Sequence, residues 1–312
     1  MFTSLAILAM LKLTAPQQTI DTILVVPEHG RLEVTSARGS VHIATWSRAD
    51  IRVRVVLPQH DQIEVDRLGS LLSIVAHSER GISKPEVTAI SSEKLRIRTV
   101  DTLRTALRYE ITIPHRLDVT VSGLHTTISV DSADGNIELS NSAGRIEVTG
   151  GSGSLRATSL VGSIAVTAFR GGILARTMHG GVSALNTIGN LQASTVLGPL
   201  TLNGVEASEV TASTYSGDLT FTGTVPSRAR FELSTHTGAL KLTLPTLVNT
   251  TLDISQSRGQ LEMCQVLNES KGPDGSTRRF MLGTGESSIR LDTFSGTIGV
   301  CTSRATNRSN EQ

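Results

Sequence analysis

Apolar and polar residues alternate along most of the chain in short runs, the pattern of strands that bury one face. The clearest runs follow a glycine, as in Gly135-Asn-Ile-Glu-Leu and Gly144-Arg-Ile-Glu-Val. A strand of about four residues cannot bury its apolar face alone, so repeated short units indicate stacked copies, a solenoid. In the centre of the chain the glycine returns every nine residues without a break, at Gly135, Gly144, Gly153, Gly162, Gly171, Gly180, Gly189 and Gly198.

Longer units further along indicate how many strands make one coil. Gly217, Gly238 and Gly259 are equally spaced at a wider interval, and between each pair lies a strand without the glycine, Arg230-Phe-Glu-Leu and then Thr251-Leu-Asp-Ile. One coil there holds two strands, so two nine-residue units should make a coil of about 18 residues. We predict an all-β fold, a β-solenoid (β-helix) with two short strands per coil of about 18–21 residues. A triangular coil of three strands, which would stack every third unit, is the alternative.

The two-strand coil sorts the inward positions into apolar columns, with small residues beside larger ones, as a thin and closely packed core requires. One sheet would stack Ile137, Leu155, Ile173 and Leu191 beside Leu139, Ala157, Ala175 and Ala193. The other would stack Ile146, Ile164, Val182 and Leu200 beside Val148, Val166, Ala184 and Leu202. A further apolar column falls at corner positions, at Leu160, Met178 and Val196.

The pattern continues less regularly on both sides of the nine-residue units. Gly30-Arg-Leu-Glu-Val and Gly39-Ser-Val-His-Ile repeat the same phrase, and the units at Ser288 and Gly296 are expected to close the stack. Polar stretches with Gly and Pro predict loops at residues 77–92 and 266–277. The expected organisation is a signal-like leader at 1–19, an N-terminal β section at 20–121, regular solenoid repeats at 122–302, and a disordered tail at 303–312.

The first fifteen residues are mostly apolar, as in a secretory signal, although Lys12 interrupts them and a basic start is missing. We therefore expect an exported protein, periplasmic or at the cell surface. A hydrophobic first strand or a disordered end is the alternative, and the protein would then be cytoplasmic. In an exported protein Cys264 and Cys301 could pair, since adjacent coils would bring them within reach. Two buried thiols are the other interpretation.

Charge and motifs narrow the classes of function. The net charge is +1, from 29 Lys and Arg against 28 Asp and Glu, and there is no run of like charges, which gives no electrostatic footprint for nucleic acid or an anionic membrane. Aromatic residues are 3% of the chain, in keeping with the narrow interior of stacked coils. The segment Gly150-Gly-Ser-Gly-Ser-Leu155 has the glycines of a calcium-binding nonapeptide but Leu where the ligand Asp belongs. The eight histidines show no metal-like spacing.

The carboxylates do not form a catalytic pair in the two-strand coil. Glu138 and Glu147 would lie on different sheets, and Glu138 would face Arg156 one coil away as an exposed charge pair. We identify no catalytic, cofactor-binding or metal-ligating residue, and expect a protein that is not an enzyme and has no cofactor. The binding residues stay unknown. Outward Ser and Thr ladders can bind glycans or ice but are also usual on a solvated sheet, as at Ser140, Thr149, Thr158, Thr167 and Ser194.

Several short motifs resemble a known family. They are Gly30-Arg-Leu-Glu-Val, Gly39-Ser-Val-His-Ile-Ala-Thr-Trp46, Tyr109-Glu-Ile-Thr-Ile-Pro114, the central glycine units, and the ending Gly283-Thr-Gly285-Glu-Ser-Ser-Ile to Gly296-Thr-Ile. Together they resemble the bacterial putative-adhesin family, domain of unknown function 4097, over roughly residues 20 to 301. The resemblance implies an exported or envelope-associated β-solenoid and supplies no catalytic or ligand residues.

The function expected from these observations is that of a non-enzymatic, adhesin-like β-solenoid of the cell envelope, which binds an envelope protein or a surface glycan on its sheet faces. An envelope-stress or regulatory binding module is one alternative. A carbohydrate-active solenoid enzyme is another, and it would need acids or bases that converge from adjacent coils. No nucleic acid and no small-molecule cofactor are expected as partners.

Overall fold

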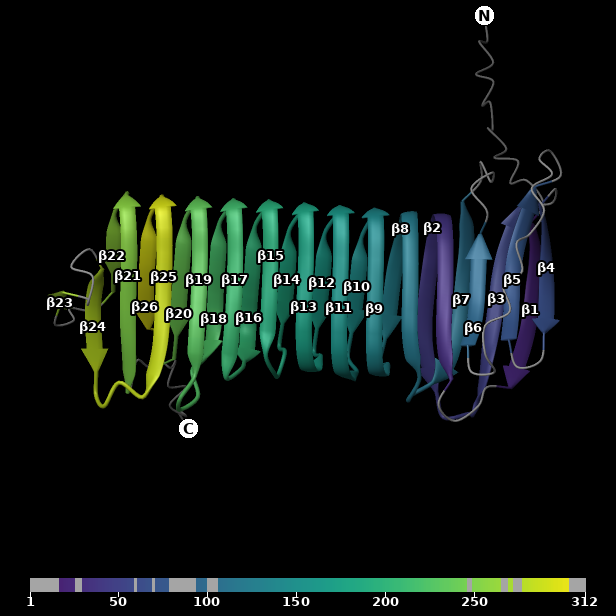
Figure 1. Ribbon diagram of the computed structural model, residues 1–312, viewed down its shortest axis with the longest axis horizontal. Helices are drawn as coiled ribbons and strands as arrows, with labels where there is room; N and C mark the ends of the chain where they lie inside the picture. The colour runs from purple at the N-terminus through teal and green to yellow at the C-terminus, as the bar shows by residue number, and fades with distance from the viewer. Residues whose placement is uncertain are drawn as a thin grey trace, which may run out of the picture.

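The computed structural model describes residues 17–25, 30–58, 61–68, 71–78, 94–99, 106–245, 249–264, 269–271 and 277–302. In this part of the chain every regular element is a β-strand, which confirms the all-β prediction, and the strands form one elongated sheet (Figure 1). The described residues contain no helix with the length and apolar character of a membrane span. The expected tail at 303–312 and most of the expected leader lie outside the described residues.

The pairings of the sheet fall into two ladders, and β2 (Arg31–Trp46) and β8 (Asp118–Asp131) run through both. Ladder A contains, in spatial order, β4 (Asp61–Leu68), β5 (Leu71–Ser78), β6 (Lys94–Thr99), the first halves of β2 and β8, β9 (Asp134–Ala143), β11 (Ser152–Val161), β13 (Arg170–His179), β15 (Leu191–Leu197), β17 (Glu209–Ser216), β19 (Arg230–Thr237), β25 (Ser287–Ser295), β21 (Thr250–Arg258), β24 (Arg278–Leu282) and β23 (Glu269–Lys271).

Ladder B lies behind ladder A in Figure 1. It contains, in spatial order, β1 (Gln17–Val25), β3 (Asp50–Pro58), β7 (Leu107–Pro114), the second halves of β2 and β8, β10 (Ile146–Thr149), β12 (Ile164–Thr167), β14 (Val182–Leu185), β16 (Leu200–Glu206), β18 (Leu219–Thr224), β20 (Leu240–Leu244), β26 (Ile298–Thr302) and β22 (Leu261–Met263). The chain alternates between the ladders, so one strand of each makes a repeat.

The central strands are parallel, and their register has the expected step. Ile137 pairs with Leu155, which pairs with Ile173, so partners lie two nine-residue units apart and not three. The step widens by one residue between β15 and β17 and by two more between β17 and β19. The predicted pairing of every second unit is therefore confirmed for the nine-residue units.

The core lies between the ladders as one continuous hydrophobic cluster. All sixteen residues of the four predicted inward columns are buried, with at most 3% of any residue exposed. The corner column differs, since Leu160, Met178 and Val196 are 51%, 45% and 42% exposed. These three side chains therefore contribute to a surface and not to the core.

The regular glycines form two columns. Gly135, Gly153, Gly171 and Gly189 stack where ladder A strands begin, and the other four stand at the corner from ladder A to ladder B. At Gly162 the φ angle is +146°, and a Cβ would lie 2.0 Å from the carbonyl oxygen of Gly144. No side chain fits there, so the corner requires glycine. The corner column continues through Gly217, Gly238, Gly296 and Gly259.

The order of the last repeats corrects the sequence prediction. β25 and β26 do not close the stack but lie between β19 and β21 and between β20 and β22, as the yellow β25 shows in Figure 1. The unit at Thr251 is therefore not the direct neighbour of the unit at Arg230. Hairpin β23–β24 caps ladder A beyond β21, so the expected loop at 266–277 contains a strand. Alternating apolar residues fit any neighbour equally well, which is why the pattern did not fix this order.

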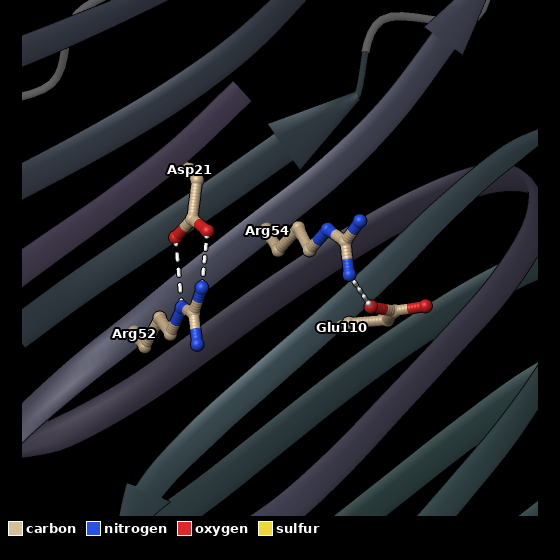
Figure 2. A network of polar contacts seen from close by, with 4 residues as sticks. All are labelled: Asp21, Arg52, Arg54 and Glu110. Carbon is tan, nitrogen blue, oxygen red and sulfur yellow. Dashed lines mark hydrogen bonds and ion pairs between the residues drawn. The ribbon is translucent and has the colours of Figure 1, made fainter. Parts of the chain in front are cut away.

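The opposite end is built from antiparallel strands. β1 is antiparallel to β3, and β3 to β7, so this end departs from the parallel ladder. Arg52 Nε donates to Asp21 Oδ1 at 2.8 Å and Arg52 Nη2 donates to the other carboxylate oxygen, while Arg54 Nη1 lies 3.3 Å from Glu110 Oε2 (Figure 2). The hydrogen bonds from Arg52 hold the pKa of Asp21 below its ordinary value of 3.8. These contacts join neighbouring strands β1, β3 and β7 on one exposed face.

Other local predictions have mixed outcomes. The first strand begins at Gln17, within the range expected for the leader and before the expected start of the β section at residue 20. Ser78 ends β5, and the rest of the expected loop at 77–92 lies outside the described residues. Cys264 and Cys301 form a disulfide with Cα atoms 4.9 Å apart, so the cysteines pair and are not free thiols.

Candidate functional site

The outer face of ladder A carries two parallel columns over β15, β17, β19 and β25. The serine column is Ser194, Ser213, Ser234 and Asp292, which pair in register across neighbouring strands. The aromatic ridge, two residues further along each strand, is Val196, Tyr215, His236 and Phe294. Both columns point outward because inward-facing threonines alternate with them.

The rings of the aromatic ridge stack on one another. The ring centroids of Tyr215 and His236 are 4.5 Å apart with a 10° angle between planes, and those of His236 and Phe294 are 4.8 Å apart with a 5° angle. The spacing follows from the parallel ladder, in which neighbouring strands lie about 4.8 Å apart. Arg258 continues the stack, with its guanidinium carbon 5.8 Å from the Phe294 centroid. The ring faces cover each other, so the ring edges are presented to the surroundings.

A groove of about 500 Å³ follows the serine column beside this ridge. Its outward hydroxyl groups are those of three serines and Tyr215, its threonines face inward, and Asp292 is its only carboxylate. It consists of Thr177, Ser194, Thr195, Val196, Ser213, Thr214, Tyr215, Ser234, Thr235, His236, Asp292 and Phe294. The groove therefore offers a row of neutral hydrogen-bonding groups and one apolar wall.

Buried threonines beneath the groove donate hydrogen bonds to the carbonyl oxygens of the corner glycines. Thr195 Oγ1 donates to the carbonyl oxygen of Gly180 at 2.8 Å, and Thr214 Oγ1 donates in the same way to Gly198 at 3.1 Å. The hydroxyl of Thr235 repeats the contact one repeat further on. Each bond joins a repeat to the one before it, so the columns above are fixed in place before any ligand arrives.

A second cluster brings together a serine, a histidine and an aspartate. His42 Nδ1 lies 2.8 Å from Ser129 Oγ, and His42 Nε2 lies 3.8 Å from Asp131 Oδ2. A hydrolytic triad also needs unoccupied N–H donors to stabilise an oxyanion. β2 and β8 have neighbours on both sides in this part of ladder B, so their N–H groups are engaged in the ladder. We interpret the cluster as a cross-strand polar contact.

The residues that the sequence analysis considered for catalysis or metal binding lie in separate parts of the structure. Glu138 lies on β9 of ladder A and Glu147 on β10 of ladder B, so the two carboxylates do not converge. Glu138 and Arg156 are partners in register as predicted, but no ion pair within 4.0 Å joins them. Leu155, in the calcium-like segment, is buried in the core. Among the described residues no three His, Cys, Asp or Glu side chains lie together so as to hold a metal ion.

The groove was not predicted, yet the sequence contains a signal for it. Each ridge residue stands two positions before a corner glycine, as Tyr215 does before Gly217 and Phe294 before Gly296. Each serine-column residue stands four positions before the same glycine, as Ser213 does. Alignment of the units on their corner glycines would have shown both columns, although not the order of the last repeats.

Comparison with known proteins gives little beyond this geometry. No protein-family model matches the chain, and no curated protein matches it. A solved structure described as a putative adhesin from Bacteroides fragilis is 12% identical, covers 92% of this chain and 98% of its own, and has a TM-score of 0.39. A putative cell adhesion protein from Clostridium sporogenes is 9% identical, with 92% and 100% covered and a TM-score of 0.23.

A third solved structure is described as a putative lipid binding protein from Parabacteroides distasonis. It is 9% identical, covers 92% of this chain and 97% of its own, and has a TM-score of 0.28. These three likenesses carry no inference about function, which has to come from the residues themselves.

Proposed function

We propose that the protein is a non-enzymatic, adhesin-like β-solenoid of the bacterial cell envelope that binds a neutral glycan chain in the groove of ladder A. The groove, with its hydroxyl floor and aromatic wall, is the observation that carries this proposal. The resemblance of the glycine-led motifs to the bacterial putative-adhesin family supports the adhesin-like class. The β-solenoid is supported by the strand pairing, because from Leu155 to Phe231 each ladder A strand pairs with the corresponding strand of the next repeat.

The chemistry of the groove disfavours other polymers. A peptide that adds a β-strand needs an unpaired sheet edge, but β15, β17 and β19 each have a neighbour on both sides. An amphipathic helix needs an apolar floor, whereas this floor is Ser194, Ser213 and Ser234. A polyanion needs clustered Lys or Arg, and neither lines the groove.

A neutral glycan chain is the polymer whose chemistry matches the groove. Its hydroxyl groups both donate and accept hydrogen bonds, as do those of the serine column and of Tyr215. Its apolar C–H surfaces can pack against the ring edges of the aromatic ridge. The groove is lined from five neighbouring strands, β13, β15, β17, β19 and β25, so it suits a linear chain and not a compact ligand. Pre-formed sites of this kind combine a few fixed polar groups with an apolar wall.

The same lining supports binding without catalysis. Hydrolysis of a glycosidic bond commonly uses two carboxyl groups that flank the bond, and the groove has Asp292 alone. The Cys264–Cys301 disulfide supports export, because disulfides persist in oxidising compartments. With export, the ligand would be a glycan of the cell surface or of a neighbouring cell.

The experiment is a glycan array with the full chain and three variants. Ser213→Leu fills the floor, Tyr215→Ala removes part of the wall, and Thr201→Leu places the same bulk on an exposed position of ladder B. We expect neutral glycans to be retained, with little change when salt is added, because no ion pairs are involved. Binding should be lost in the first two variants and kept in the third.

Three results would contradict the proposal. They are an array without retained neutral glycans, undiminished binding by Ser213→Leu, and release of new reducing ends from a bound glycan, which would make the protein a hydrolase. Thermal unfolding of each variant shows whether lost binding reflects lost structure. A Ser213→Leu chain with an unchanged unfolding midpoint and no binding is the expected outcome.

A further inference from the structure

The charges of the chain are unevenly distributed, although they nearly cancel overall. Between Glu147 and Glu206 there is no Asp or Glu, while Arg156, Arg170 and Arg176 fall in this stretch. All three arginines are exposed on β11 and β13, on the outer face of ladder A, and none makes an ion pair within 4.0 Å with a described residue. Arginines therefore outnumber carboxylates in the centre of ladder A, where Glu138 is the in-register neighbour of Arg156.

Exposed aliphatic side chains gather at the corner where β11 and β13 end, on the side of Arg156 and Arg176, whereas Arg170 lies at the opposite end of β13. Five residues from three consecutive repeats form this apolar corner, and each is between 42% and 51% exposed: Leu160, Val161, Met178, Val196 and Leu197. They occupy the last positions of their strands, just before the corner glycines, so they stand on a convex edge. His179 lies between Val161 and Leu197 in the same row.

From this juxtaposition we infer that the apolar corner docks on an anionic lipid surface, with Arg176 and Arg156 on the phosphate groups. A convex apolar edge can enter the boundary between headgroups and acyl chains without a shaped partner. Guanidinium groups bind phosphate oxygens in pairs, and each basic residue near an anionic surface strengthens binding. The three strands that form the corner, β11, β13 and β15, carry no carboxylate that would repel such a surface.

The size of the corner argues against a second copy of the chain as its partner. Three repeats extend for about 10 Å along the ladder, because neighbouring strands lie about 4.8 Å apart. A stable protein interface buries about 800 Å² on each partner, far more than an edge of this length offers. Tyr215, on the next repeat, is 58% exposed and extends the edge with an aromatic side chain of the kind found at membrane interfaces.

The test is sedimentation of the full chain with vesicles of phosphatidylcholine alone or with a quarter of phosphatidylglycerol. We expect binding to the anionic vesicles only, and a decrease when salt is added. Arg156→Gln and Arg176→Gln should each weaken partitioning about fivefold. Leu160→Ser combined with Met178→Ser should abolish it. Leu185→Ser, a matched change at a 40% exposed position on ladder B, should have no effect.

The same experiment separates this inference from the glycan proposal. Ser213→Leu should leave vesicle binding unchanged, since the serine column is not part of the apolar corner. Equal binding to neutral and anionic vesicles, no binding to either, or an equal loss with Leu185→Ser would overturn the inference. So would a dimer in solution that Leu160→Ser dissociates, because the corner would then contact a second copy.

Discussion

Gly296 lies directly over Gly238, although the whole repeat of β21 and β22 comes between them in the chain. A Cβ on Gly296 would lie 1.9 Å from the carbonyl oxygen of Gly238, and one on Gly259 would lie 1.8 Å from that of Gly296. The repeat formed by β25 and β26 is thus inserted between two repeats that come earlier in the sequence. Insertion completes the groove, because it places Asp292 and Phe294 beside Ser234 and His236.

A cross-linking experiment tests this order of repeats. Ser234 and Asp292 are direct partners in ladder A, whereas Ser255 is one strand further away. Neighbouring strands are about 4.8 Å apart, and a disulfide requires Cα atoms within about 7 Å. We expect Ser234→Cys with Asp292→Cys to cross-link on oxidation, and Ser234→Cys with Ser255→Cys to stay reduced. Non-reducing electrophoresis after proteolysis separates the two outcomes, and the reverse result would restore the order of the sequence.

The regular part of the fold could be predicted because the sequence of each unit determines which side chains face inward and where the chain turns. Inward columns such as Ile137–Leu155 follow from alternation, and the step of two units follows from the glycines. The order of the last repeats could not be predicted from the pattern. Ile289 stacks on Phe231, but Leu252 would fit the same position beside Phe231 equally well. The order of the units in the sequence predicted the wrong neighbouring strand for β19. The groove depends on the strand that actually lies there, β25. The aromatic ridge was missed because His236 and Phe294 become adjacent only through the insertion.

The corner glycines provide a second prediction. Gly180 has a φ angle of +145°, and a Cβ there would lie 2.3 Å from the carbonyl oxygen of Gly162. Gly180→Ala should therefore reduce the free energy of unfolding by at least about 2 kcal/mol, from backbone strain and displacement of the adjacent repeat. Urea unfolding followed by circular dichroism measures the change.

Gly172→Ala is the control, because a Cβ at Gly172 would meet nothing within 4 Å. We expect that variant to differ from the parent by no more than about 0.5 kcal/mol. If the two alanine variants were equally stable, the close approach of the stacked glycines would not be what excludes side chains at the corner.

The N-terminal ion pairs give a pH prediction. The pKa of Asp21 is lowered by the hydrogen bonds from Arg52, so its contribution to stability is present above the ordinary value of 3.8 and is lost as the pH falls through the lower folded value. Hydrogen exchange of β1 amides, corrected for the intrinsic effect of pH, should show weaker protection below that point. Asp21→Asn should weaken protection at neutral pH and remove this pH dependence, and the same profile in both proteins would contradict the assignment.

The disulfide supports the repeats that complete the groove. Cys264 follows β22 and Cys301 lies on β26, so the bond joins the inserted repeat to its outer neighbour across a sequence separation of 37 residues. A cross-link over a loop of this length stabilises a fold by about 4 kcal/mol, chiefly by restricting the unfolded chain. Reduction, or Cys264→Ser with Cys301→Ser, should lower the unfolding midpoint and weaken glycan binding through Asp292 and Phe294. The double serine variant should not respond to reductant, and an unchanged midpoint on reduction would show that β26 keeps its place without the bond.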